Sequence, residues 1–306
     1  MTSPAPPVFV GGINRSGTTL MARIIGSSSA VAVPPSEFLF FGRRAGVPPA
    51  DRAEFERRLA AILRWPRVRE WDLDDREVME HSRSWSASAR SLFVLPLESY
   101  RTQTGKARLG EKSVLNEFRL DVLRAWFGDY RLVHMIRDPV AAYASSFAGQ
   151  PPDARRAIRW GRVWLASAVT GLQPAREDAV RHRLVRYEDL TADPRATIAS
   201  VAEFVGVPFE ESAMLDLAGY DEKENSSFAA SANGTYEGAI RNGDDVDRRA
   251  AVHPRDRLAL ASICGHAARA LGYRLERRPS IAVALARAAV DARPRHRLRT
   301  LRATLS

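Results

Sequence analysis

Residues 8–25 read VFVGGINRSGTTLMARII, and this stretch decides the expected fold. A β-branched and aromatic run ends in two glycines, and a polar turn follows. Apolar residues at Leu20, Met21, Ile24 and Ile25 then fall at helical spacing. The order predicts a strand, a phosphate-binding loop and a helix.

The predicted loop has the glycine spacing of the ATP-binding P-loop, because Gly12 and Gly17 bracket four residues. Such loops direct backbone N–H groups and the positive end of a helix dipole toward one anion. An ATP or GTP hydrolase places a lysine after the second glycine, whereas this chain has Thr18, which disfavours triphosphate cleavage. A tight strand–helix connection without a ligand is the alternative. The hydrogen-bond donors packed between Arg15 and Thr19 favour anion binding.

Composition sets wider bounds. The 306 residues, 45% of them apolar, suit one α/β domain with insertions. A single cysteine, Cys264, cannot form an internal disulfide, and the chain shows neither a membrane-spanning apolar run nor a signal peptide, so we expect a cytoplasmic protein. The net charge of +10 attracts anions, but no RNA-binding or zinc-finger motif supports a nucleic-acid partner.

A glutamate follows the second predicted strand. Residues 31–33 form this short strand, and two prolines end it. Glu37 then stands beyond the carboxyl end, where ligands collect in an open α/β sheet. Three neighbouring phenylalanines predict an apolar setting, which would suit a general base at neutral pH. A capping role at a helix start beside Ser36 is the alternative.

Residues 42–105 read as a mostly helical insertion and are a candidate cover for an acceptor. Residues 108–113 then predict a strand that ends near Lys112, before a helix at 118–127. A solvated surface charge is the alternative for this lysine. Its place between strand and helix supports a functional role equally well.

The apolar run at residues 131–136 predicts a buried strand in which His134 is a core histidine. Arg137 ends the strand, and Pro139 suits the first turn of the next helix. Ser145 lies eight residues after Arg137, about two helical turns, so both side chains would face one side. An arginine fork and a hydroxyl together suit a second phosphate.

Residues 184–190 predict another strand and turn, and a helix at 194–205 follows. Alternating strands and helices indicate an α/β fold with a parallel sheet flanked by helices. Residues 225–242 read as a loop, and a last helix is expected at 255–271. The basic tail, residues 277–306, suits either contact with an acidic membrane or partner surface or a solvated helix.

Taken together, these motifs resemble sulfotransferases that use 3′-phosphoadenosine 5′-phosphosulfate (PAPS), most closely their tyrosylprotein sulfotransferase-like and bacterial branch. Residues 10–21 resemble the family's 5′-phosphosulfate loop, and Arg137 with Ser145 resembles its 3′-phosphate site. Lys112 stands where the family has a catalytic lysine, and residues 186–190 resemble the segment beside the adenine. The resemblance spans residues 8–273 and implies a sulfotransferase domain at 1–276.

The resemblance also implies roles for single residues. The residues that would bind the PAPS donor are Arg15, Ser16, Gly17, Thr18, Thr19, Arg137, Ser145, Tyr187, Ser226 and Arg241. Glu37 would be the general base, with Lys112 and Arg15 stabilising the transition state of in-line sulfuryl transfer. The cytosolic small-molecule branch has a histidine shortly after the lysine. Here Ser113 and Val114 follow, which favours Glu37.

The resemblance implies that the reaction needs no metal. It also implies that the acceptor is a hydroxyl group on a small molecule, glycan, lipid or peptide tyrosine. Two other functions stay open: a magnesium-dependent nucleotide enzyme such as a P-loop kinase, and a non-catalytic nucleotide or polyanion binder. Thr18 argues against the first. The joint presence of Arg15, Glu37, Lys112 and Arg137 argues against the second.

Overall fold

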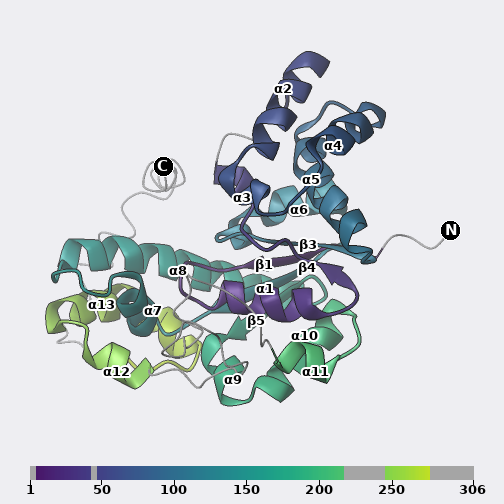
Figure 1. Cartoon of the computed structure of the whole chain (residues 1–306). Helices are drawn as coiled ribbons and strands as arrows, with labels where there is room; N and C mark the ends of the chain where they lie inside the picture. The colour runs from purple at the N-terminus through teal and green to yellow at the C-terminus, as the bar shows by residue number, and fades with distance from the viewer. Residues whose placement is uncertain (1–4, 43–46, 217–244, 276–306) are drawn as a thin grey trace, which may run out of the picture.

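A parallel five-stranded sheet forms the centre of the molecule in a computed structural model, which describes residues 5–42, 47–216 and 245–275 (Figure 1). The strand order is β2-β3-β1-β4-β5. The strands are β1 (Val8–Gly11), β2 (Val31–Ala32), β3 (Arg108–Lys112), β4 (Arg131–Ile136) and β5 (His182–Arg186). The predicted α/β fold with a parallel sheet is therefore confirmed.

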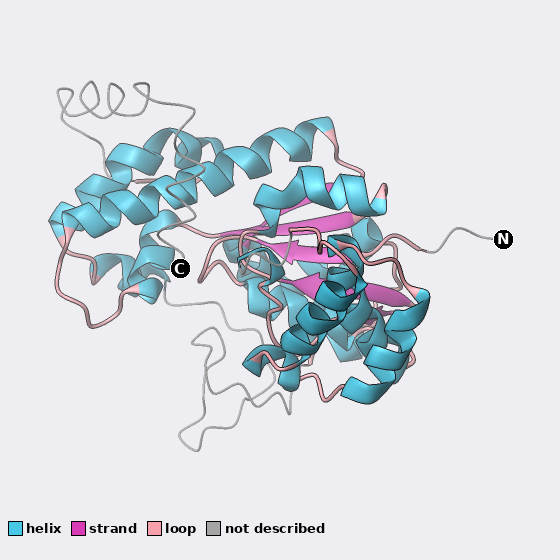
Figure 2. Ribbon diagram, turned by 90° about the horizontal axis from the view of Figure 1, so that it is seen from above, coloured by secondary structure: helices cyan, strands magenta, loops and turns pink. Residues whose placement is uncertain are grey.

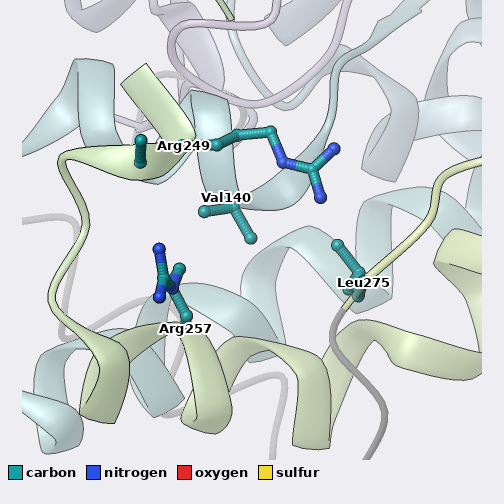
Figure 3. Close-up of a pocket in the computed structure, with 5 residues that line it drawn as sticks. Val140, Arg249, Arg257 and Leu275 are labelled. Atoms are coloured by element: carbon teal, nitrogen blue, oxygen red, sulfur yellow. The ribbon is translucent and has the colours of Figure 1, made fainter. Parts of the chain in front are cut away.

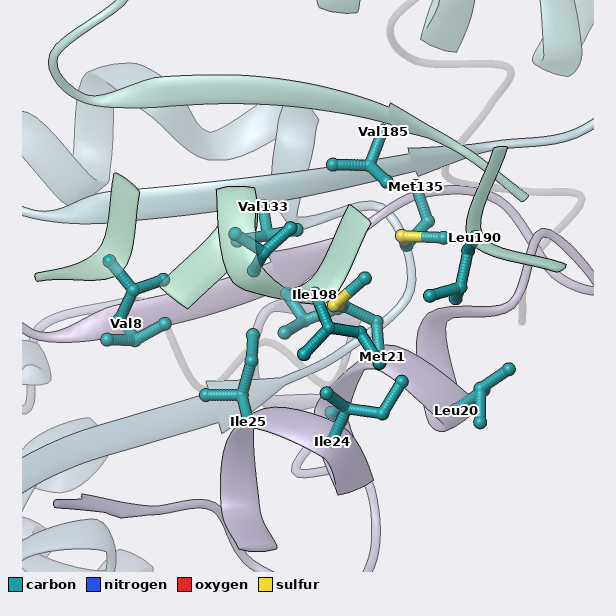
Figure 4. Close-up of a cluster of buried hydrophobic side chains, with 14 of the residues drawn as sticks. Val8, Leu20, Met21, Ile24, Ile25, Val133, Met135, Val185, Leu190 and Ile198 are labelled. Carbon is teal, nitrogen blue, oxygen red and sulfur yellow. The ribbon is translucent and has the colours of Figure 1, made fainter. Parts of the chain in front are cut away.

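The two faces of β1 belong to different hydrophobic clusters, because successive side chains of a strand alternate. Val8 and Val10 pack with α1 (Thr18–Ser27) and α10 (Pro194–Val205), as Figure 4 shows for the side chains of this cluster. Phe9 faces the other way, into an aromatic cluster. The predicted order of strand, loop and helix is confirmed, and the loop lies at the carboxyl end of the central strand.

The described part of the predicted insertion is mostly helical and lies on the Phe9 side of the sheet (Figure 1). Phe38 stacks on Phe93 and Phe40 meets it edge-on, with ring centroids 5.5 and 5.2 Å away. Trp71 is buried beside Phe38, which is the core role typical of tryptophan. The helices of this region are α2 (Arg52–Leu63), α3 (Pro66–Arg69), α4 (Asp75–His81) and α5 (Ala89–Thr104), with the 3₁₀ turns η1 (Phe40–Gly42) and η2 (Ser82–Ser84).

Two long helices cover the β4–β5 side and extend beyond the sheet (Figures 1 and 2). The first, α8 (Ala154–Glu177), was not predicted, whereas α13 (Pro254–Ala270) matches the predicted last helix. The two helices pack against each other at Cys264 of α13, whose Sγ lies 3.4 Å from the Gly161 carbonyl oxygen of α8. The buried face of α8 contains residues at helical spacing: Ala157, Gly161, Trp164, Ala168 and Gly171.

Some predicted bounds change. Residues 187–190, predicted as part of a strand and turn, belong to α9 (Tyr187–Ala192). The predicted helix at 118–127 starts as the 3₁₀ turn η3 (Asn116–Arg119) and continues as α6 (Leu120–Phe127). The remaining helices are α7 (Pro139–Ser146), α11 (Glu211–Leu215) and α12 (Asp245–Ala250). The predicted 225–242 loop and basic tail lie outside the described residues, and among the helices described none has the length and apolar character needed to cross a membrane.

Candidate active site

The loop after β1 requires glycine at two positions. Gly12 has φ 133°, and a Cβ there would lie 2.3 Å from the Met135 carbonyl oxygen. Gly17, the N-cap of α1, has φ 89°, and a Cβ there would lie 2.6 Å from Tyr187 Cδ2. Only glycine adopts such conformations without strain and permits such close approach.

Replacing Gly12 by alanine is expected to lower the free energy of unfolding by at least about 2 kcal/mol, because strain and a backbone overlap add. Gly105→Ala is the matched control: Gly105 also has positive φ, 68°, but a Cβ there meets nothing within 4 Å. We expect it to cost about 1 kcal/mol. Denaturant unfolding measures both. Equal losses would contradict the close packing assigned to the loop.

The loop has the features of an anion site. Ser16 is fully buried, and its Oγ has no hydrogen-bond partner among the residues that the structure describes. The first turn of α1 carries no acidic side chain, and its N-cap Gly17 supplies no capping group, so among the described residues no side-chain cap covers the start of this helix, where anions bind. Since buried hydroxyls in native proteins are normally paired, the orphaned Ser16 Oγ fits a bound phosphate.

Two arginines meet at one hydroxyl beside the loop, and a third contacts the first of them. Arg15 Nε donates to Ser145 Oγ at 2.9 Å, and Arg248 also donates to this oxygen at 3.4 Å. Arg137 is buried, donates to the Arg15 carbonyl at 3.2 Å and lies 4.1 Å from the ring centroid of Tyr187. Burial, and then the charges of Arg137 and Arg248, lower the pKa of Arg15. Cations held this close together suit a multiply charged anion.

The sequence analysis gave Arg15 a role in stabilising the transition state. In the structure its side chain lies with Ser145 and Arg137, the expected 3′-phosphate pair. Sequence reasoning also missed Arg248, which lies 103 residues from Ser145 in the sequence. Arg248 follows a segment of low sequence regularity and belongs to no motif. Only the placement of α12 beside α7 reveals it.

The neighbouring arginine of α12 points elsewhere. Arg249 forms an ion pair with Asp138 at 3.2 Å and lines a pocket of about 220 Å³ with Val140, Arg257 and Leu275 (Figure 3). Asp138 in turn caps α7 by accepting from two of its first N–H groups. Consecutive arginines thus fix α12 on two sides, and Arg248 is the one directed to Ser145.

A lysine and a glutamate meet at the same sheet edge. Lys112 is buried at the end of β3, and its Nζ donates to Thr19 Oγ1 at 2.9 Å and to Glu37 Oε1 at 3.0 Å. The other oxygen of Glu37 lies 3.4 Å from a guanidinium nitrogen of Arg67, a residue of α3. This lysine therefore joins the phosphate loop to a carboxylate.

The surroundings of Glu37 differ from the sequence expectation. Phe38 and Phe40 pack into the aromatic cluster, so the setting of the carboxylate is cationic, not apolar. The capping alternative also fails, because residues 37–39 are not helical and the Ser36 hydroxyl donates to the Arg67 carbonyl at 2.6 Å. A carboxylate between two cations is held in place.

Comparison with known proteins identifies the family of the chain. Residues 6–211 match the model of a family described as "Sulfotransferase family". The chain belongs to the sulfotransferase family. A comparison with curated proteins gives no match.

Solved structures similar to this sulfotransferase share its fold. One is the sulfotransferase domain of the Synechococcus PCC 7002 olefin synthase, 20% identical, with a TM-score of 0.59 over 90% of this chain and 98% of that one. Another is the sulfotransferase domain of the curacin biosynthetic pathway, 18% identical, with a TM-score of 0.55 over 90% of this chain and 100% of that one.

A second carboxylate lies next to the segments that carry Lys112 and Glu37 in the sulfotransferase. Glu111 is buried, and its oxygens accept from Ser113 Oγ at 2.5 Å and from Asn116 Nδ2 at 2.6 Å. Ser113 Oγ also accepts from the Leu39 N–H at 2.9 Å. Glu111 therefore ties together the segments that carry Lys112 and Glu37. Burial raises its pKa to about 7, against the smaller effect of the two hydrogen bonds.

This raised pKa gives an expected pH dependence. The folded carboxyl of Glu111 holds its proton more tightly than the unfolded one, whose ordinary pKa is 4.5, so its favourable contribution is lost as pH rises toward about 7. Between pH 5 and pH 8, wild type should lose roughly 2–3 kcal/mol of stability relative to Glu111→Gln. Urea unfolding at both values measures it, with Glu56→Gln, at a partly exposed position on α2, as the control. A pH-independent difference would contradict a titrating Glu111.

Proposed function

We propose that this sulfotransferase moves the sulfuryl group of PAPS to an acceptor hydroxyl by in-line displacement. The observation that carries the proposal is the position of Lys112 Nζ, within 3.0 Å of both Thr19 Oγ1 and Glu37 Oε1. One cation thus contacts the loop that would hold the departing phosphate and the carboxylate that would accept a proton.

The residues present fit the proposed sulfuryl donor. The buried hydroxyl of Ser16 and the N–H groups at the start of α1 would bind its 5′-phosphate. Arg137, Ser145 and Arg248 would bind its 3′-phosphate, since the positive charges of Arg137 and Arg248 lie close to Arg15 at the Ser145 hydroxyl. When bound, PAPS supplies an activated sulfuryl group. Further contacts that we propose come from Gly17, Thr18, Thr19 and Tyr187, and from Ser226 and Arg241, which lie outside the described residues.

The chain's own groups would then divide the chemistry. Glu37 takes the proton of the acceptor hydroxyl, and its ion pairs with Lys112 and Arg67 orient it. Lys112 stabilises the negative charge that grows on the departing phosphate side. Arg15 belongs to the phosphate loop but contacts Ser145, so we propose that its charge serves both the sulfuryl and 3′-phosphate sides.

Sulfur-35 label on PAPS tests the function directly. The protein is incubated with labelled PAPS and a panel of phenols, sugars, lipids and tyrosine peptides, with and without EDTA. We expect label on an acceptor hydroxyl, at a rate that EDTA leaves unchanged. Transfer of label only from γ-phosphate-labelled ATP, dependent on Mg²⁺, would identify a kinase instead and overturn the proposal.

A further inference from the structure

A second buried glutamate lies directly behind the phosphate loop. Glu117, in η3, is fully buried, and its Oε2 accepts from the Gly12 N–H at 2.8 Å. Gly12 is the first residue of the loop with positive φ. Its N–H is therefore turned into the protein, away from any ligand that the loop would bind.

The two residues before Glu117 also form hydrogen bonds with the segment that contains Gly12. The Leu115 N–H donates to the Gly12 carbonyl at 3.1 Å, and Asn116 Nδ2 donates to the Val10 carbonyl at 3.1 Å. A Cβ on Gly11 would lie 3.1 Å from Glu117 Oε2, so the two segments are in tight contact. Both polar groups of the Gly12 backbone are thus fixed, the N–H by Glu117 and the carbonyl by Leu115, two residues that follow Lys112 closely in the sequence.

The other carboxylate oxygen of Glu117 ends a buried chain of polar side chains. Ser167 Oγ donates to Oε1 at 2.7 Å, His134 Nε2 lies 2.9 Å from Ser167 Oγ, and His182 Nε2 lies 3.2 Å from His134 Nδ1. Gly171 lets α8 approach, since a Cβ there would lie 2.7 Å from His134. Burial lowers the pKa of both histidines to about 3, so they are neutral at physiological pH.

These contacts give Glu117 a fixed orientation. An ionised Glu117 accepts hydrogen bonds at both oxygens, which sets the direction of the other hydrogen bonds in this row of side chains. His182 then donates to His134, and His134 donates to Ser167. Burial raises the pKa of Glu117, so the carboxylate is an expensive group to keep beside an anion site. An apolar residue would fill the space without this penalty but could not hold the Gly12 N–H.

We propose that Glu117 is a positioning residue for the phosphate loop, which it holds through the Gly12 N–H in the conformation that receives the sulfuryl donor. The inference rests on the proposed function for the identity of the ligand, and on the observed contacts for the loop itself. Such support from behind a site keeps its geometry within the narrow limits that binding needs.

Four variants test it: Glu117→Ala, Glu117→Gln, Ser167→Ala and, as a control, Arg108→Met. Arg108 is also buried and bonded to backbone carbonyls, but at the opposite end of β3. Two readouts are used, with thermal unfolding to establish that each variant is folded. The first is hydrogen exchange of residues 8–17 without ligand, and the second is calorimetric affinity for 3′-phosphoadenosine 5′-phosphate (PAP).

Glu117→Ala should speed exchange in the loop at least about tenfold and weaken PAP binding about tenfold, because the Gly12 N–H loses its acceptor. Glu117→Gln keeps an acceptor and should stay within about threefold of wild type in both. Ser167→Ala, a gentler change, should shift both readouts in the same direction by less. Arg108→Met should lower the melting temperature and change neither.

Wild-type values for a folded Glu117→Ala would overturn the proposal, as would an equal loss in the glutamine variant, and Ser167→Ala decides the matter if the alanine variant does not fold. If wild type does not bind PAP, the proposed function fails, while the exchange measurement still decides whether Glu117 holds the loop.

Discussion

Replacing Lys112 by alanine is expected to lower kcat by two to three orders of magnitude, because loss of one such charge-stabilising group costs roughly 3–4 kcal/mol in the barrier. The Nζ contacts both Thr19 and Glu37, so its removal also frees the carboxylate. PAP affinity should fall much less, since the arginines around Ser145 remain. Steady-state kinetics with an identified acceptor, and PAP calorimetry, separate the two effects.

Lys106→Ala is the control for this variant. Lys106 lies before the opposite end of β3 and donates to the Gly26 carbonyl. Its loss should leave kcat unchanged. A Lys112→Ala enzyme with wild-type kcat would show that the lysine has no catalytic role and would contradict the account.

Replacing Glu37 by glutamine is expected to lower kcat about 10²- to 10⁴-fold, the range typical for loss of a general base. Glutamine has nearly the same shape and can still accept from Lys112 and Arg67, but it cannot take up a proton. The measurement is kcat of wild type and variant with the same acceptor.

Glu98→Gln provides the comparison for this variant. Glu98 pairs with Arg101 on α5, at a partly exposed position outside the site. The change should leave kcat intact. A Glu37→Gln enzyme that keeps its rate would assign the base elsewhere.

Local sequence predicted which candidate residues come together at the sheet edge, for a physical reason. Strands, turns and glycine loops depend on a few neighbouring residues, so residues 8–25 were enough for strand, loop and helix. Lys112 and Arg137 were placed by the rule that strands of a parallel sheet end at one edge. The structure does bring Lys112 to Glu37 and Arg137 to the loop.

Long-range contacts were beyond the reach of sequence patterns. Arg248 and Glu117 act through partners 103 and 105 residues away, and nothing local distinguishes them from other charged residues. The predicted apolar surroundings of Glu37 were wrong, because local sequence cannot tell whether neighbouring phenylalanines surround a side chain or point away from it. The α8 helix had a readable signal, the small residues at helical spacing in its buried face.

The measurement that tests the account most directly is calorimetric titration with PAP, compared with ATP in the presence and absence of Mg²⁺, for wild type and Arg137→Ala. Arg137 is buried between the loop and Tyr187, so its loss should weaken PAP binding about 100-fold. The exposed Arg124→Ala should bind like wild type. The account predicts tight, metal-independent binding of PAP that is lost in Arg137→Ala. A preference for ATP with Mg²⁺, or unchanged PAP affinity in that variant, would contradict it.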